Sequence, residues 1–148
     1  MSSIKTDGII QVGIVVKDIE KSAKMYSDCF GLEMPNIRLA FPNIEFKGTK
    51  PTVTARLCSF RIGNITIELI QPGEEMTSWR EFMDKHGEGV HHIGFMVEDI
   101  QAAYKACEEN GLSLRQFGGA DWGSYSIMEG NNIGVFFNVK TNEPYKGD

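Results

Sequence analysis

The sequence predicts an α+β fold in which two βαβββ modules form a curved, mixed sheet of roughly eight strands around a concave pocket. Three observations support this prediction: a repeated segment, a stretch of helical periodicity after each copy, and short strand-like runs after each helix. The repeat aligns residues 11–19 (QVGIVVKDI) with residues 92–100 (HIGFMVEDI) at an offset of 81, and four of the nine positions are identical. Because the helix of a βαβββ unit covers one face of its sheet, the other face needs a partner, which the second unit provides.

The repeat divides the whole chain, taken as a single domain, into two halves. We assign residues 1–72 to the first module, residues 73–87 to a connecting helix and residues 88–148 to the second module. The connecting helix should open at the capping-box pattern SWRE of residues 78–81 and end near Gly87.

Each copy of the repeat should be a strand that leads into a helix. Asp18 and Asp99 each follow an apolar, β-branched run and can accept hydrogen bonds from the first free N–H groups of a helix. Gly31 and Gly111 suit the left-handed position that ends a helix. The side chains expected to face the sheet are Ile19, Ala23, Tyr26 and Phe30 in the first helix, and Ile100, Ala103, Tyr104 and Cys107 in the second.

Paired short strands should follow each helix. In the first module, residues 54–60 and 65–70 flank a Gly-Asn turn, and in the second, residues 124–128 and 133–139 flank a Gly-Asn-Asn segment. Residues 33–53 contain three prolines and little periodicity, so we expect a long loop of the kind that often forms a binding flap.

Composition excludes several classes of protein. The 148 residues include 15 Lys+Arg and 20 Asp+Glu, for a net charge of −5, which argues against nucleic acid as a partner. No apolar run approaches the ~20 residues of a membrane span, and we find no signal peptide. The three cysteines form no CxxC pattern and are typical of free thiols. We therefore expect a cytoplasmic protein with no membrane partner.

Three motifs make the chain similar to a known superfamily. They are residues 15–19 (VVKDI), residues 65–72 (ITIELIQP) and, most specifically, residues 85–93 (KHGEGVHHI). With them the chain resembles the vicinal oxygen chelate superfamily, which includes glyoxalases, bleomycin resistance proteins and dioxygenases, and within it the methylmalonyl-CoA epimerase branch. The resemblance covers nearly the whole chain and implies the two-module fold, a small-molecule substrate or ligand, and a homodimer.

The resemblance also implies a metal site, with one ligand on each of four strands. The matching positions are Gln11, Glu68, His92 and Asn138, and the implied cofactor is one divalent ion of Mn, Co, Ni, Mg or Zn. The set departs from that of the epimerases, which usually have His at the position of Gln11 and Glu at the position of Asn138. Glu68 stands where they often have Gln. Since an amide cannot take a proton, the base that the epimerases have at the position of Asn138 is missing here.

Each of these residues has a structural alternative. His92 can be a hydrogen-bonded core histidine, Gln11 and Asn138 can be structural amides, and Glu68 can lie on an exposed strand edge. His91, next to His92 on a strand, should point to the other face as a packed residue.

Further candidates could complete the pocket. Glu45 and Glu129 are candidates for a second base. The aromatic residues that could line the pocket are Phe41, Phe46, Trp122 and Tyr125.

Three functions remain open at this point. The first is an enzyme that forms an enolate from a small carbonyl compound or acyl-CoA thioester, as an isomerase, epimerase or lyase, with Glu68 as metal ligand and base. The second is a metal-free protein of the same fold that binds or sequesters a small molecule. The third is an interaction subunit whose pocket is vestigial.

Overall fold

The computed structural model describes residues 2–40 and 43–144, and these form a single curled, mixed sheet with three helices. The strands are β1 (Ile9–Val15), β2 (Arg38–Leu39), β3 (Ile44–Phe46), β4 (Arg56–Ile62), β5 (Ile65–Gln71), β6 (Gly89–Met96), β7 (Ser113–Ala120), β8 (Gly123–Glu129) and β9 (Phe136–Thr141). The helices are α1 (Ile19–Phe30), α2 (Ser78–His86) and α3 (Ile100–Glu109). The predicted fold class is confirmed, with nine strands in place of roughly eight.

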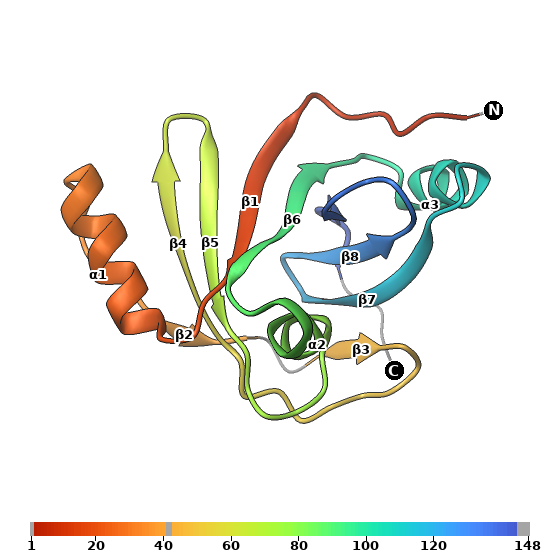
Figure 1. Ribbon diagram of the computed structural model, residues 1–148. Helices are drawn as coiled ribbons and strands as arrows, with labels where there is room; N and C mark the ends of the chain where they lie inside the picture. The colour runs from red at the N-terminus through yellow and green to blue at the C-terminus, as the bar shows by residue number, and fades with distance from the viewer. Residues whose placement is uncertain (1, 41–42, 145–148) are drawn as a thin grey trace.

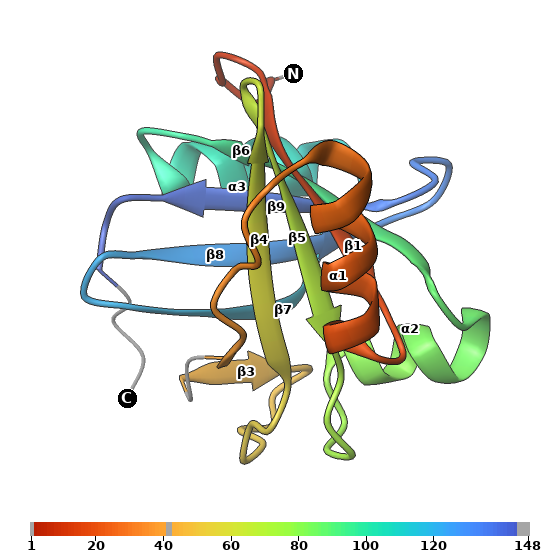
Figure 2. The ribbon, with the colours of Figure 1, turned by 90° about the vertical axis from the view of Figure 1, so that its left-hand side faces the viewer.

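The two halves of the chain meet at the centre of the sheet. The strand order is β2-β4-β5-β1-β6-β9-β8-β7-β3, with β1 antiparallel to β6. On either side, the first strand of each half pairs in parallel with its last strand, β1 with β5 and β6 with β9. In Figure 2, β4 and β5 run nearly upright while β7, β8 and β9 cross behind them, so the sheet curls around a concave side. Helix α1 lies outside the first half and α3 outside the second (Figure 1).

The predicted helix ends are confirmed. Asp18 Oδ1 accepts from the backbone N–H of Lys21 at 3.2 Å, and Asp99 Oδ1 accepts from that of Ala102 at 3.0 Å. Gly31 and Gly111 both have positive φ, of 66° and 83°, and so end α1 and α3 in the left-handed conformation.

The buried faces differ slightly from the predicted ones. Helix α1 buries Ile19, Ala23 and Ser27, whereas Phe30 is 56% exposed, so the prediction for Phe30 is wrong. Phe30 lies in the last turn of α1, where its ring stacks on that of Tyr26.

Helix α2 begins at Ser78, but its N-cap is Thr77, whose hydroxyl accepts from the backbone N–H of Arg80 at 3.2 Å. The predicted capping box is therefore wrong. Ser78 is fully buried, and Glu81 binds Lys85 and Arg115 instead of the helix start. The helix packs against β1 and β6, at the lower end of the curled sheet in Figure 1.

The segment expected to be a loop connects the two edges of the sheet. Within it, β2 pairs with β4 at one edge and β3 pairs with β7 at the other. Residues 41–42 lie between them and outside the described residues, so the predicted pocket residue Phe41 is not placed. In the second half, the last strand begins at Phe136, three residues later than the sequence predicts.

No helix in the described parts of the chain is long and apolar enough to cross a membrane.

Candidate functional site

The concave side of the sheet holds a small cavity. An apolar cluster that includes Val15, Ile44, Leu57 and Ile70 borders this cavity, which Ile44 and Leu57 help to line. The cavity has a volume of about 90 Å³. It is lined by three charged side chains (Arg38, Glu68, Lys140), two polar ones (His92, Asn138), three aromatic ones (Trp79, Trp122, Tyr125) and four aliphatic ones (Ala40, Ile44, Leu57, Ile127).

The four residues proposed as metal ligands come together, one from each of β1, β5, β6 and β9, and all of them except Gln11 line this cavity. His92 Nε2 lies 3.0 Å from Gln11 Oε1 and 3.7 Å from Glu68 Oε1. Gln11 Nε2 donates to Glu68 Oε2 at 3.4 Å, and Asn138 Nδ2 donates to Gln11 Oε1 at 3.1 Å. Three of the four are 6% exposed or less, and the Glu68 side chain is 15% exposed. The strand-edge alternative for Glu68 is therefore wrong.

The glycine shared by the two copies of the repeat makes room for this cluster. Gly13 pairs with both Glu68 and His92 across the neighbouring strands, and Gly94 pairs with Gln11 and Asn138. A methyl group on Gly94 would lie 2.8 Å from Gln11 Oε1, and one on Gly13 would overlap the imidazole of His92. Each half therefore uses its glycine to accommodate a polar side chain of the other half.

Gly13→Ala should consequently destabilise the fold. His92 is 1% exposed and held by hydrogen bonds, so its ring cannot move aside without breaking them. We expect a loss of about 1–3 kcal/mol in the free energy of unfolding, measured by chemical denaturation. In a His92→Ala background the same substitution should cost much less. An equal cost in both backgrounds would contradict this explanation.

A line of buried hydrogen bonds leads to His92 from the far side. Arg115 Nε donates to Ser78 Oγ at 2.7 Å, Ser78 Oγ lies 2.8 Å from His91 Nε2, and His91 Nδ1 lies 2.8 Å from His92 Nδ1. The two adjacent imidazoles meet because β6 bulges here: His92 pairs with Gly13 but Val90 pairs with Ile14, which leaves His91 as an extra residue. His91 is thus a packed residue that supports His92.

The direction of these bonds assigns the protons of both histidines. Burial lowers the pKa of His91 well below its usual range, and burial together with Lys140 lowers the pKa of His92 to about 3, so both rings are neutral. Gln11 Oε1 can only accept, so the neutral His92 donates from Nε2 and accepts at Nδ1 from His91, whose own Nε2 then accepts from the Ser78 hydroxyl. His92 then carries its proton on Nε2 and donates to Gln11.

Glu68 is the chemically distinctive group of the cluster. Burial raises its pKa, while the positive charges of Lys140 and Arg38 oppose that rise. Both cationic residues line the same cavity as the carboxylate. A carboxylate with a raised pKa is suited to accept a proton near neutral pH.

The structure brings only some of the other candidate residues to the cavity. Trp122 and Tyr125 line it. The lining does not include Glu45, which lies between buried Ile44 and buried Phe46 on β3, so its side chain alternates to the other face.

Phe46 and Glu129 both contact Arg115. Phe46 packs under the guanidinium, with Cζ 5.2 Å from the ring centre, and Glu129 Oε2 accepts from Nη1 at 2.9 Å. Among the described residues, neither Glu45 nor Glu129 therefore adds a second carboxylate to the cavity.

Three charged or aromatic lining residues were missed from the sequence, besides the four aliphatic ones. Lys140 lies two residues after Asn138, so the period of a strand could have placed it on the same face. Arg38 belongs to the proline-containing segment, where no pattern was visible. Trp79 is on α2, and nothing in the sequence indicates that this helix turns a side chain toward the cavity.

The spacing of the polar cluster is close to that of the ligands around a divalent ion. Neighbouring ligands of a six-coordinate ion with ~2.1 Å bonds are ~3.0 Å apart, close to the distance between His92 Nε2 and Gln11 Oε1. Asn138 Oδ1 is buried with no hydrogen-bond partner among the described residues, so it is available as an additional oxygen ligand. In the described chain, no group of three or more His, Cys, Asp or Glu side chains could hold a metal. The residues fit a hard cation that accepts amide oxygens, once His92 moves its proton from Nε2 to Nδ1 and His91 moves its own from Nδ1 to Nε2.

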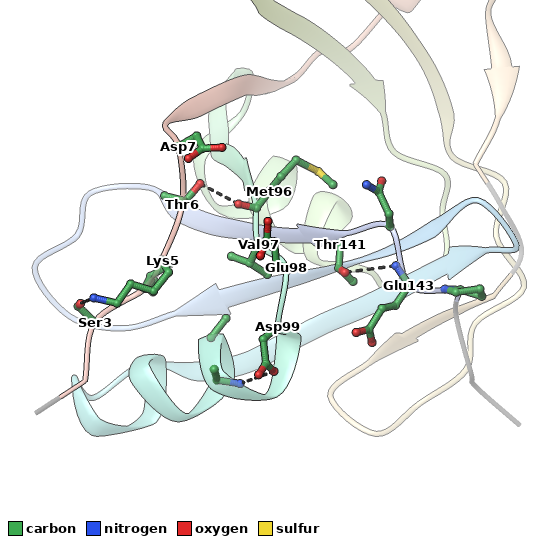
Figure 3. A pocket seen from close by; sticks show the side chains of 15 residues that line it. Ser3, Lys5, Thr6, Asp7, Met96, Val97, Glu98, Asp99, Thr141 and Glu143 are labelled. Atoms are coloured by element: carbon green, nitrogen blue, oxygen red, sulfur yellow. Dashed lines mark hydrogen bonds between the residues drawn. The ribbon is translucent and has the colours of Figure 1, made fainter.

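A second, larger groove of about 1130 Å³ lies between the N-terminal segment and the end of β6 (Figure 3). Its polar groups serve local structure: Asp99 caps α3, and Thr6 Oγ1 donates to the carbonyl oxygen of Met96 at 2.7 Å. We therefore place the candidate site in the smaller cavity.

With this geometry, the chain belongs to the glyoxalase/bleomycin resistance protein/dioxygenase superfamily, whose family model matches residues 10–125. Two relatives are similar to it in sequence. The ethylmalonyl-CoA/methylmalonyl-CoA epimerase of Cereibacter sphaeroides is 31% identical over 104 residues, or 70% of each chain. The 4-hydroxyphenylpyruvate dioxygenase of Danio rerio is 30% identical over 99 residues, which cover 67% of this chain but only 23% of the dioxygenase.

Solved structures share the same fold. The methylmalonyl-CoA epimerase of Mycobacterium tuberculosis superposes with a TM-score of 0.67 at 20% identity, covering 97% of this chain and 93% of the other. A hypothetical protein of Bacillus halodurans superposes with a TM-score of 0.68 at 22% identity, covering 97% and 100%. The branch that the sequence motifs resemble is thus found among the relatives in both comparisons.

Proposed function

We propose that this protein is an enzyme that removes a proton from the carbon next to a carbonyl group, in a small carbonyl compound or an acyl-CoA thioester. The observation that supports this proposal is the carboxylate of Glu68, which lines the cavity with a raised pKa between two cationic side chains. General-base catalysis by a positioned carboxylate contributes about 10²–10⁴-fold to a rate.

The other lining residues supply charge and orientation. Lys140 and Arg38 attract an anionic substrate and stabilise negative charge that develops on the carbonyl oxygen. Glu68 is the only carboxylate among the described lining residues. We therefore favour an isomerisation, in which one base takes up the proton and returns it, or a lyase step. An epimerisation that uses two carboxylates is less compatible with this lining.

Gln11, Glu68, His92 and Asn138 would hold a divalent metal ion. Such an ion, when bound, would polarise the substrate carbonyl. We expect Mn²⁺ to bind in isothermal titration calorimetry, and His92→Ala to weaken this binding by about 10-fold or more, as removal of a metal-supporting group does. Glu45→Gln, outside the cavity, should leave it unchanged. If Mn²⁺ bound equally to the unmodified protein, His92→Ala and Glu45→Gln, a metal site formed by these four residues would be contradicted.

Deuterium exchange tests the proposed reaction. Methylmalonyl-CoA is the first compound to try, because structural neighbours include methylmalonyl-CoA epimerase bound to it, and small 2-oxo acids follow. The protein is incubated with each compound in D₂O, and NMR measures loss of the proton next to the carbonyl. Exchange that depends on the protein supports the proposal, and no exchange with any compound that binds would contradict it.

A second candidate function is metal-free binding of a small molecule. It is favoured by one observation: Gln11 Oε1 already accepts from His92 and Asn138, so the polar cluster is largely satisfied without an ion. Saturable binding that a chelator does not change, without proton exchange, would support this function.

A further inference from the structure

Lys140 brings a positive charge to the cavity without forming an ion pair with any carboxylate in the described parts of the chain. It follows Asn138 by two residues on β9, so both side chains lie on the same face of the sheet, and both line the cavity. Lys140 Nζ lies 6.0 Å from the ring centre of Trp122, which also lines the cavity. An aromatic face attracts a cation but is no substitute for an oxygen acceptor, so the ammonium can still donate to a ligand.

The charge of Lys140 reaches the reactive groups of the cavity. Burial raises the pKa of Glu68, and Lys140 opposes this rise more strongly than Arg38 does. Burial and Lys140 together lower the pKa of His92. Charges act strongly over short distances only, so an effect on both groups agrees with an ammonium on the cavity side of β9.

Exposure gives the cavity a direction. His92 and Asn138 are 1% and 3% exposed and form its inner part, whereas Trp122, in the turn between β7 and β8, is 50% exposed. Lys140 is half-buried beside Trp122 and therefore lies toward the open side. A ligand that enters from solvent thus meets Lys140 before it reaches Glu68.

Charge balance defines the ligand that suits this arrangement. The charged residues of the lining are Arg38, Glu68 and Lys140, with a sum of +1, and His92 is neutral. A neutral ligand that displaces water from the cavity would leave the ammonium without a partner, which costs free energy. A ligand with one negative charge near Lys140 avoids this cost.

We propose that Lys140 is a specificity-determining residue whose ammonium binds a free carboxylate of the substrate, while the carbon that loses its proton lies toward Glu68. The substrate is then a small oxo acid in preference to a neutral carbonyl compound of the same shape. The cavity of about 90 Å³ equals about three water molecules at ~30 Å³ each, which suits the end of such an acid. This assignment rests on the proposed function and adds the group by which the substrate is recognised.

An acid and its amide form a pair of probes that differ mainly in charge. The probes are pyruvate with pyruvamide and acetoacetate with acetoacetamide, titrated into the full chain by isothermal titration calorimetry. In at least one pair we expect the acid to bind about 10-fold more tightly, which is the effect of one hydrogen bond between charged groups. If neither acid bound more tightly than its amide, or if neither acid bound at all, the proposal would be overturned.

Lys140→Met tests whether Lys140 is the source of this preference. The variant keeps an unbranched side chain and removes the ammonium, so the ratio of the two affinities should fall to within a factor of about two, and Lys140→Gln should act in the same way. Lys140→Arg should retain the preference. Lys5→Met is the control, because Lys5 lines the outer groove of Figure 3, and it should leave the ratio unchanged. A preference that survives in Lys140→Met and Lys140→Gln would overturn the proposal.

A second role for Lys140 would give a different result. If the lysine served only to offset the charge of Glu68, Lys140→Met would change the pH dependence of proton exchange for acid and amide alike. The ratio of their affinities would then stay as it is in the unmodified protein, and the assignment of Lys140 to the carboxylate would be wrong.

The proposed function can fail independently of this assignment. Glu68→Gln should abolish proton exchange and keep the preference for the acid. A preference that depends on Lys140, together with no exchange in the unmodified protein, would reject the proposed reaction and retain Lys140 as a ligand-binding residue. Exchange that is equally efficient for acid and amide would retain the reaction and overturn the role of Lys140.

Discussion

Glu68→Gln is expected to slow deuterium exchange next to the substrate carbonyl by about 100-fold or more, because an amide cannot accept the proton. The substitution preserves the size of the side chain and its position on β5. Glu45→Gln and Glu129→Gln are matched controls, since neither residue lines the cavity, and both should leave the rate within a factor of about two. If either control slowed exchange as much as Glu68→Gln, the assignment of Glu68 as the base would be wrong.

The same variant should be at least as stable as the unmodified protein. Burial raises the pKa of Glu68, so the folded state favours the protonated carboxyl group. A raised carboxyl pKa costs stability as the pH rises above the ordinary value of 4.5, because the folded protein must hold a buried charge. Gln has no such charge. We therefore expect the stability gain from Glu68→Gln to be larger at pH 8 than at pH 4, measured by chemical denaturation.

The internal repeat accounts for much of what could be predicted. It located Asp18 and Asp99 as helix caps and related Gln11 to His92, which the structure places 3.0 Å apart between Oε1 and Nε2. It also contains Gly13 and Gly94, whose missing side chains make room for the cluster. These features lie on regular strands and helix ends, where local spacing determines which way a side chain points.

What escaped prediction depends on contacts between distant segments. Trp79 reaches the cavity only because α2 packs across β1 and β6. The bulge that brings His91 against His92 breaks the period of the strand. The sequence made Glu129 a candidate for the cavity, but its carboxylate is bound by Arg115 outside the cavity lining. Such partners become visible only when the whole chain is folded.

Arg115 should have the largest effect on stability. It is 4% exposed, yet it binds Glu81 Oε1 at 3.1 Å, Glu129 Oε2 at 2.9 Å and Ser78 Oγ at 2.7 Å. Its guanidinium also lies 4.6 Å from the ring centre of Phe136. It thereby joins α2 to three strands and supports the imidazole pair behind the site.

Arg115→Met is expected to lower the free energy of unfolding by about 3–5 kcal/mol, because Glu81, Glu129 and the buried hydroxyl of Ser78 each lose a hydrogen-bond partner. Lys21→Met, at an ion pair whose lysine is 87% exposed, is the control and should cost about 0–1 kcal/mol. Denaturant unfolding at pH 7 measures both.

Acid should reduce the effect of this substitution. Burial raises the pKa of Glu81, but hydrogen bonds from Lys85 and Arg115 outweigh it and lower the pKa to about 2. A lowered carboxyl pKa stabilises the fold above the ordinary value of 4.5, and this contribution is lost as the pH falls toward 2. Without Arg115, the pKa of Glu81 is lowered less. The difference in the free energy of unfolding between Arg115→Met and the unmodified protein should therefore narrow as the pH falls from 5 to 3. A difference that stays constant over this range would mean that Arg115 stabilises the fold through packing on the aromatic rings and not through its charge.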